Sequence, residues 1–130
     1  MAFRCVVVTP EMQVLDADAT QAILPAHDGL LGVLTGRAPL LVKLGLGPLT
    51  VDGVDGKRQV YFIDGGVAQV KDDVLTIATT EATPSQELDA DQARAELAEA
   101  TAQRANASLP ADLRERSVRR AQAKLAMAVK

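Results

Sequence analysis

The stretch PAHDGLLGVLTGRAPLL, residues 25–41, decides the fold that this sequence can adopt. It has glycine at positions 29, 32 and 36 and proline at 25 and 39, with leucines and a valine between them. Glycine reaches positive φ without a steric clash, and proline fixes φ and lacks an amide donor. The stretch therefore predicts two short strands joined by tight turns at the tip of a β-domain. Leucines exposed on such a tip indicate a partner-binding surface, whereas leucines folded inward would form a corner of the core.

The composition indicates an aliphatic core, because the 130 residues include two phenylalanines, one tyrosine and no tryptophan. This length suits one domain with a small appendage, or two small domains. No apolar run approaches the roughly 20 residues of a membrane-spanning helix, and the first residues do not follow the pattern of a signal peptide. A single cysteine, Cys5, excludes an internal disulfide and fits a reducing compartment. We expect a soluble cytoplasmic protein in which Cys5 is buried and inert.

The first 80 residues have the pattern of β-strands. Segment 57–64 has Val60 and Phe62 on one face and Tyr61 and Ile63 on the other, segment 74–79 alternates, and segment 3–9 is β-branched and apolar. Turn signals occur at 52–53, 55–56, 64–66 and 71–73. This spacing predicts a sandwich of antiparallel sheets with about eight to ten strands.

The pattern becomes helical after Pro84. Asp89, followed by Gln92, has the spacing of a capping box, which predicts a first helix to about Asn106. A break at 107–111 and a second helix from about Asp112 would make an αα-hairpin. The expected fold class is therefore α+β, with an N-terminal antiparallel β-sandwich over residues 1–86 and a C-terminal antiparallel two-helix hairpin over 87–130. The stripes expected to join the two helices are Ala93, Leu97 and Ala100 on the first, and Leu113, Ala121, Leu125 and Val129 on the second.

Charge is distributed unevenly behind the net value of −3. Residues 1–86 carry −4, residues 87–110 carry −3, and residues 111–130 carry +4. A basic terminal segment after an acidic one can pair internally or bind an acidic partner.

Neither an active site nor a metal site is expected. The sole histidine, His27, lies in a turn, and Cys5 lies in a strand, so the sequence offers no nucleophile–base pair or ligand cluster. Segment 53–57 has the wrong spacing for a phosphate-binding loop and is better explained as a hairpin turn. We expect a protein that is not an enzyme and needs no cofactor.

Three motifs resemble those of one known family, and they occur in its order along nearly the whole chain. They are the glycine-rich stretch itself, the Asp64–Gly65–Gly66 segment followed by a strand, and Asp91-x-x-Arg94-Ala95 at the start of the first helix. Together they resemble the epsilon subunit of bacterial F-type ATP synthases. Thr35 and Arg37 depart from the family, in which proline and histidine are common at these positions.

The resemblance implies a non-catalytic central-stalk subunit of a proton- or sodium-translocating synthase. Its sandwich would bind the gamma subunit and the c ring, coupling the catalytic head to the membrane rotor, with no nucleic-acid partner. It would be peripheral at the cytoplasmic face of the bacterial plasma membrane, without inserting into the bilayer. The implied interface comprises His27, Asp28, Gly29, Leu30, Leu31, Gly32 and Arg37.

Asp91 and Arg94 match the residues that help to bind ATP in some members of the family. At a spacing of three they share a helix face, so a guanidinium could meet phosphate there, giving a weak regulatory ATP site. An ordinary ion pair within the helix explains the same spacing.

The resemblance also implies that the terminal helices inhibit ATP hydrolysis. Four cations, Arg116, Arg119, Arg120 and Lys124, would form one strip that meets acidic segments of the beta (and alpha) subunits. The same strip could instead pair with Glu96 and Glu99 within the hairpin. Another class of protein is also open, a free-standing β-domain binding module with a helical dimerisation tail, although such a tail favours large apolar residues at heptad spacing and this one has mostly alanine.

Overall fold

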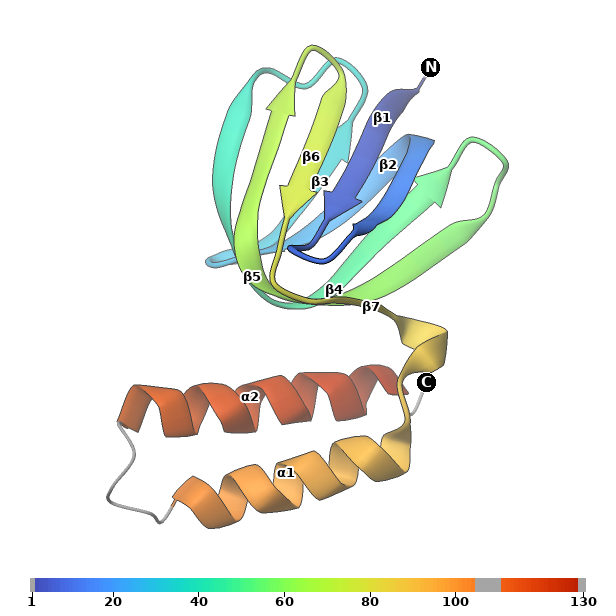
Figure 1. The fold of residues 1–130 in the computed structure, drawn as a ribbon. Coiled ribbons are helices and arrows are strands. Elements are labelled where there is room, and N and C mark those ends of the chain that lie inside the picture. Colours follow the sequence, from blue (N-terminus) through green and yellow to red (C-terminus); the bar gives the residue numbers. More distant parts are fainter. Residues whose placement is uncertain (1, 105–110, 129–130) are drawn as a thin grey trace. The chain divides into compact units, whose positions relative to one another are not determined.

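The computed structural model describes residues 2–104 and 111–128. The chain divides between Pro84 and Ser85 into two compact units, a β unit and a helical unit. Figure 1 shows the strands in the first unit and the helices in the second. Strands followed by two helices confirm the predicted fold class, a β-sandwich with a C-terminal helical hairpin.

Seven strands form the β unit, which is fewer than the eight to ten predicted. They are β1 (Phe3–Val8), β2 (Gln13–Ala26), β3 (Gly29–Leu34), β4 (Leu40–Gly53), β5 (Arg58–Lys71), β6 (Val74–Ala78) and β7 (Ala82–Pro84). Their order is β1-β6-β5-β4-β2-β3, while β7 pairs with β5 and β1 also pairs with β2. The pairings are antiparallel except that of β1 with β6, which is parallel and was not predicted.

The strand count was too high because three strands are 14 residues long. The turn predicted at residues 64–66 was wrong, since Gly65 (φ 71°) and Gly66 (φ 109°) lie inside β5 and bend it without ending it. A Cβ at Gly66 would collide with the carbonyl oxygen of Ala78 on β6. The close approach of two backbones therefore requires glycine here.

The turns predicted at 55–56 and 71–73 are confirmed, whereas residues 52–53, also predicted as a turn, are the last residues of β4. Residues 54–57 join β4 to β5, and the amide of Gly53 donates to the carbonyl of Lys57 over 2.9 Å. Asp72 and Asp73 join β5 to β6 with φ of 52° and 58°. Two successive residues of positive φ are typical of a type I′ hairpin turn.

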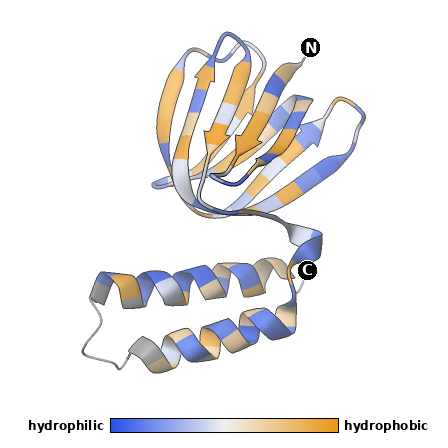
Figure 2. Ribbon diagram, viewed as in Figure 1, coloured by the Kyte–Doolittle hydropathy of each residue, from blue (hydrophilic) through white to orange (hydrophobic). Residues whose placement is uncertain are grey.

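The core of the β unit is mainly aliphatic, as the composition predicts, although Phe3, Tyr61 and Phe62 are buried as well. Figure 2 shows hydrophobic residues alternating with hydrophilic ones along the strands. Cys5 is fully buried among these side chains and forms no disulfide, which confirms its predicted placement. Burial raises the pKa of its thiol to about 12, so the thiol is neutral at physiological pH. The largest fully buried side chains are Phe62, Leu24, Leu49, Ile63, Leu75 and Ile77.

The helical unit begins with a short 3-10 helix, η1 (Ser85–Glu87), followed by α1 (Ala90–Arg104) and α2 (Ala111–Ala128). The predicted cap is confirmed, because the Asp89 carboxylate accepts hydrogen bonds from the amides of Asp91 (2.8 Å) and Gln92 (3.3 Å). The helix end predicted at Asn106 lies outside the described residues. So does the break predicted at 107–111, except for its last residue. No helix in the described parts of the chain is long and apolar enough to cross a membrane.

Small side chains dominate the buried positions of the helices. The buried residues are Ala93, Ala100, Val118, Ala121 and Met127. Leu113 was predicted to belong to this stripe, but its side chain is 53 % exposed. It lies eight residues from Ala121, which places it about 80° around the helix. Leu97 and Leu125 are half-buried, and Val129 lies outside the described residues.

Candidate functional site

Strand β3 is an edge strand of the sheet and carries most of the predicted interface. It pairs with β2 in antiparallel register from Ala26 opposite Gly29 to Gln21 opposite Leu34. Successive side chains of a strand point to opposite faces, so Leu30, Gly32 and Leu34 share one face of β3. An edge strand with apolar residues on its outer face is available to a partner protein.

The alternation separates the leucines of β3 into inner and outer positions. Leu30 is 71 % exposed and Leu34 is 59 % exposed, whereas Val33 is buried. Leu31 packs against the core, so the prediction that it projects outward with Leu30 was wrong. Leu34 was missed, although counting by twos from Leu30 would have found it.

The turn at one end of β3 is fixed by a neighbouring strand. The amide of His27 donates to the carbonyl of Lys43 on β4 over 3.0 Å, and its Nδ1 lies 3.4 Å from the same oxygen. His27 and Asp28 are exposed, and Gly29 has a φ of 137°. The backbone of this turn is therefore held while its side chains face solvent.

Arg37 belongs to the turn at the other end of β3. Its amide donates to the carbonyl of Leu34 over 3.3 Å, and Gly36 has a φ of 82°. This combination matches a type II turn with Thr35 in the position where proline is favoured. The Thr35 hydroxyl oxygen is buried and has no hydrogen-bond partner among the described residues.

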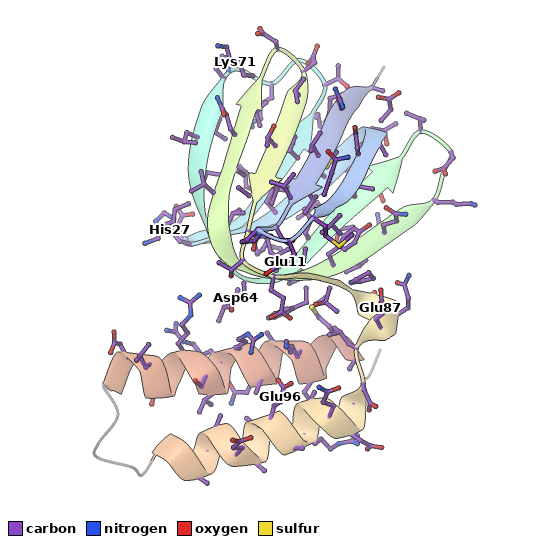
Figure 3. The ribbon with its side chains drawn as sticks, viewed as in Figure 1. Glu11, His27, Asp64, Lys71, Glu87 and Glu96 are labelled. Carbon is purple, nitrogen blue, oxygen red and sulfur yellow. The ribbon has the colours of Figure 1, made fainter. Side chains whose placement is uncertain are left out.

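A second turn anchors the Arg37 turn. The amide of Gly36 donates to the Asp73 carboxylate over 2.8 Å. Figure 3 shows Lys71, beside this second turn, and His27 at opposite ends of the sandwich. The predicted interface is therefore not a single tip, because His27 and Asp28 lie at one end of β3 and Arg37 at the other.

A pocket of about 460 Å³ lies at the Arg37 end of β3. It is lined by Gly32, Leu34, Thr35, Gly36, Arg37, Ala38, Pro39 and Leu40. Only Arg37 among these residues is charged, and the rest of the lining is mixed, with Thr35 polar and Leu34, Pro39 and Leu40 apolar.

Asp91 and Arg94 form an ion pair on the surface of α1. Arg94 Nη1 lies 2.9 Å from Asp91 Oδ1, and their side chains are 59 % and 92 % exposed. An exposed pair at this spacing contributes a few tenths of a kcal/mol to helix stability. The pair satisfies both groups within the helix, and contact with ATP stays a prediction.

The four cations of α2 do not form one exposed strip. Arg116 and Arg119 are exposed, whereas Arg120 is half-buried and the Lys124 side chain is 12 % exposed. Lys124 Nζ lies 3.7 Å from Glu96 Oε2 on α1. Glu96, Glu99 and Arg120 line one small pocket of about 160 Å³ between the helices. Lys124 and Arg120 therefore lie near carboxylates of α1. For Lys124 and Glu96, this agrees with the alternative in which the cations pair within the hairpin.

Comparison with known proteins decides the family. Residues 2–85 match the family model described as ATP synthase, Delta/Epsilon chain, beta-sandwich domain. The chain belongs to the ATP synthase epsilon family. The ATP synthase epsilon chain of Rhodopirellula baltica is 46 % identical over 125 residues, covering 96 % of this chain and 97 % of that one. The epsilon chain of Chromohalobacter salexigens is 37 % identical over 128 residues, covering 98 % and 87 %.

A solved structure agrees with the sequence matches over both units. A chain of the Euglena gracilis mitochondrial ATP synthase, solved with OSCP, F1 and the c-ring, superposes with a TM-score of 0.87. It is 26 % identical and the match covers 99 % of this chain and 82 % of that chain. This epsilon chain is thus a non-catalytic stalk subunit of the synthase. The free-standing binding module loses its support, because the relatives match both the sandwich and the helices.

Proposed function

We propose that this epsilon chain couples the catalytic head of a proton- or sodium-translocating ATP synthase to the membrane c ring, with its sandwich bound to gamma and to the ring. The exposed apolar face of β3 carries the proposal, with Leu30 71 % and Leu34 59 % exposed. A structural relative solved together with F1 and the c-ring supports it. The chain would act as a peripheral subunit at the cytoplasmic face of the bacterial plasma membrane.

Charged replacements on β3 test the coupling role. Leu30→Asp and Leu34→Asp place charges on the proposed interface. Val54→Asp, in the β4–β5 turn, is the control, because Val54 is 58 % exposed and so is close to Leu34 in exposure. We expect the β3 variants to lower ATP-driven ion pumping in reconstituted vesicles by tenfold or more, while ATP hydrolysis continues and circular dichroism is unchanged. Pumping at the control level in both β3 variants would refute the assignment of this face.

We further propose that the helical hairpin brakes ATP hydrolysis. Its buried contacts are mostly alanines, which bury little apolar area. A weakly stabilised hairpin can exchange its internal contacts for a competing partner at a cost of a few kcal/mol. The cations of α2 would then meet acidic segments of the beta (and alpha) subunits, and rotation driven by hydrolysis would stall.

Two variants test the brake. Deleting residues 111–130, or replacing Arg116 and Arg119 together by alanine, should raise ATP hydrolysis by the assembled enzyme, and high salt should partly reproduce the effect. Lys57→Ala, which removes a cation from the β4–β5 turn, should leave the rate unchanged. Unchanged hydrolysis in both test variants would show that these helices do not inhibit.

A further inference from the structure

Gly32 leaves a notch in the outer face of β3. It lies between Leu30 and Leu34 on that face, and both leucines are largely exposed. In register, Gly32 is opposite Ile23 on β2. Paired residues share a face of the sheet, so the half-buried Ile23 side chain forms the floor beside the notch.

The fold gives no reason for glycine at this position. Gly29 and Gly36 have positive φ, which favours glycine, but Gly32 does not. A Cβ added at Gly32 would meet no atom within 4 Å. Glycine inside a strand weakens it, and it often marks a place where a ligand or another backbone approaches closely. Something outside the described chain therefore explains the glycine better than the chain itself does.

The notch continues into the pocket at the Arg37 end of β3. Gly32 and Leu34 line this pocket together with Arg37. The surface thus presents two leucines, a gap between them and a single cation at one end. A membrane surface rich in anionic lipid would call for a cluster of cations. An apolar surface with one cation instead fits a protein segment with an apolar side chain and a nearby carboxylate or free carbonyl.

We propose that an apolar side chain from a loop of the c ring inserts over Gly32 between Leu30 and Leu34, while Arg37 pairs with an acceptor on the same loop. The inference rests on the proposed docking of this chain on the c ring, and it specifies how the contact is made. The notch sets the register between the two proteins, because a side chain at position 32 would occupy the space of the incoming group. Arg37 adds a charge contact that salt screens.

The test measures binding of the full chain to the detergent-solubilised c ring of its own synthase, assembled with gamma. Gly32→Ala should keep or raise the melting temperature of the isolated chain, and Gly32→Val should weaken ring binding by tenfold or more. Ala17→Val is the matched control. It enlarges an exposed side chain on β2, in the part of that strand that pairs with β1, and should bind like the unmodified chain. Arg37→Ala should bind less tightly and with a smaller dependence on salt.

Separate outcomes would overturn the two levels of the proposal. If the unmodified chain does not bind the assembled ring, both the docking role and the proposed role of the notch are refuted. If the unmodified chain binds and Gly32→Val binds equally well, the docking role stands, and the proposal that the notch receives a side chain of the ring is refuted. A clearly lower melting temperature for Gly32→Ala would show that the glycine serves the fold, and would also refute the notch.

Discussion

Lys124 Nζ on α2 lies 3.7 Å from Glu96 Oε2 on α1, and this pair joins the two helices of the epsilon hairpin. The Lys124 side chain is 12 % exposed and that of Glu96 is 33 % exposed, so solvent screens the pair less than a surface ion pair. A cation held in this way is withdrawn from other acidic partners. The pair therefore favours the closed hairpin at the expense of any state in which Lys124 binds elsewhere.

Glu96→Gln should weaken the closed hairpin. Within the proposed brake, the released cation would bind the catalytic subunits, so ATP hydrolysis by the assembled enzyme should fall. A double-mutant cycle with Lys124→Gln should give a coupling energy of about 0.5–1 kcal/mol in the isolated chain. Glu87→Gln, an exposed carboxylate on η1, is the control. A coupling energy of zero would mean that the pair contributes nothing to closure.

Thr35→Pro should stabilise the β unit. Thr35 occupies the position of the type II turn that favours proline, and proline there restricts the unfolded chain without straining the folded one. The free energy of unfolding should rise by about 0.4–1 kcal/mol, measured by urea titration. Thr35→Ala removes the buried hydroxyl without fixing φ, and so separates the two contributions. Destabilisation by proline would show that the turn is not of this type.

Replacing Asp72 and replacing Asp73 by glycine should change the stability of the chain by different amounts. Both have positive φ, so glycine relieves backbone strain at either position. Only Asp73 also accepts the Gly36 amide. Asp73→Gly should therefore be about 1 kcal/mol less stable than Asp72→Gly, because it loses this hydrogen bond. Equal stabilities in thermal unfolding would show that the bond between the two turns contributes nothing.

Cys5 should make the stability depend on pH in the alkaline range. Its pKa is raised by burial from 9.0 to about 12 in the folded chain, so the unfolded chain loses the thiol proton first. The stability that Cys5 contributes is complete below pH 9 and is lost as the pH rises toward 12. Burial, with a smaller effect from Cys5, also raises the pKa of Tyr61, which adds a loss in the same direction. Cys5→Ala should flatten the curve in part, and an unchanged curve would contradict the assignment to Cys5.

A fragment of residues 1–86 should fold without the helices. It contains all seven strands and their aliphatic core, and the chain divides into its two units between Pro84 and Ser85. Circular dichroism should show a β spectrum with a cooperative thermal transition, and the fragment should still bind gamma. An unfolded fragment would mean that the sandwich needs the helices.

The sequence was sufficient for the fold class, for the Asp89 cap and for the turns at 55–56 and 71–73, because these depend on local pattern. It was misleading at Gly65 and Gly66, since paired glycines usually mark a turn. Their purpose is a tertiary one, the close approach of Gly66 to the Ala78 backbone on β6. No local pattern contains that contact.

The same limit applied to the candidate sites. Helical spacing places Arg116, Arg120 and Lys124 on related faces, but it does not show what lies opposite them. The register between the two helices brings Lys124 to Glu96 and leaves Arg116 exposed. On β3, alternation was sufficient to separate Leu31 from Leu34 once the strand was known to begin at Gly29.

Strand β7 holds the last residues of the β unit within the sheet. Its three residues pair with β5, from Tyr61 opposite Pro84 to Ile63 opposite Ala82, in the same strand that further along pairs with β6. The chain therefore leaves the sandwich at Pro84, a residue that is still paired with a neighbouring strand. Five residues, 85–89, connect this point to the start of α1. If the helices exchange their internal contacts for another partner, as proposed, these five residues are the part of the chain that has to allow the movement. A single glycine inserted after Pro84 would lengthen this connection while leaving both units intact.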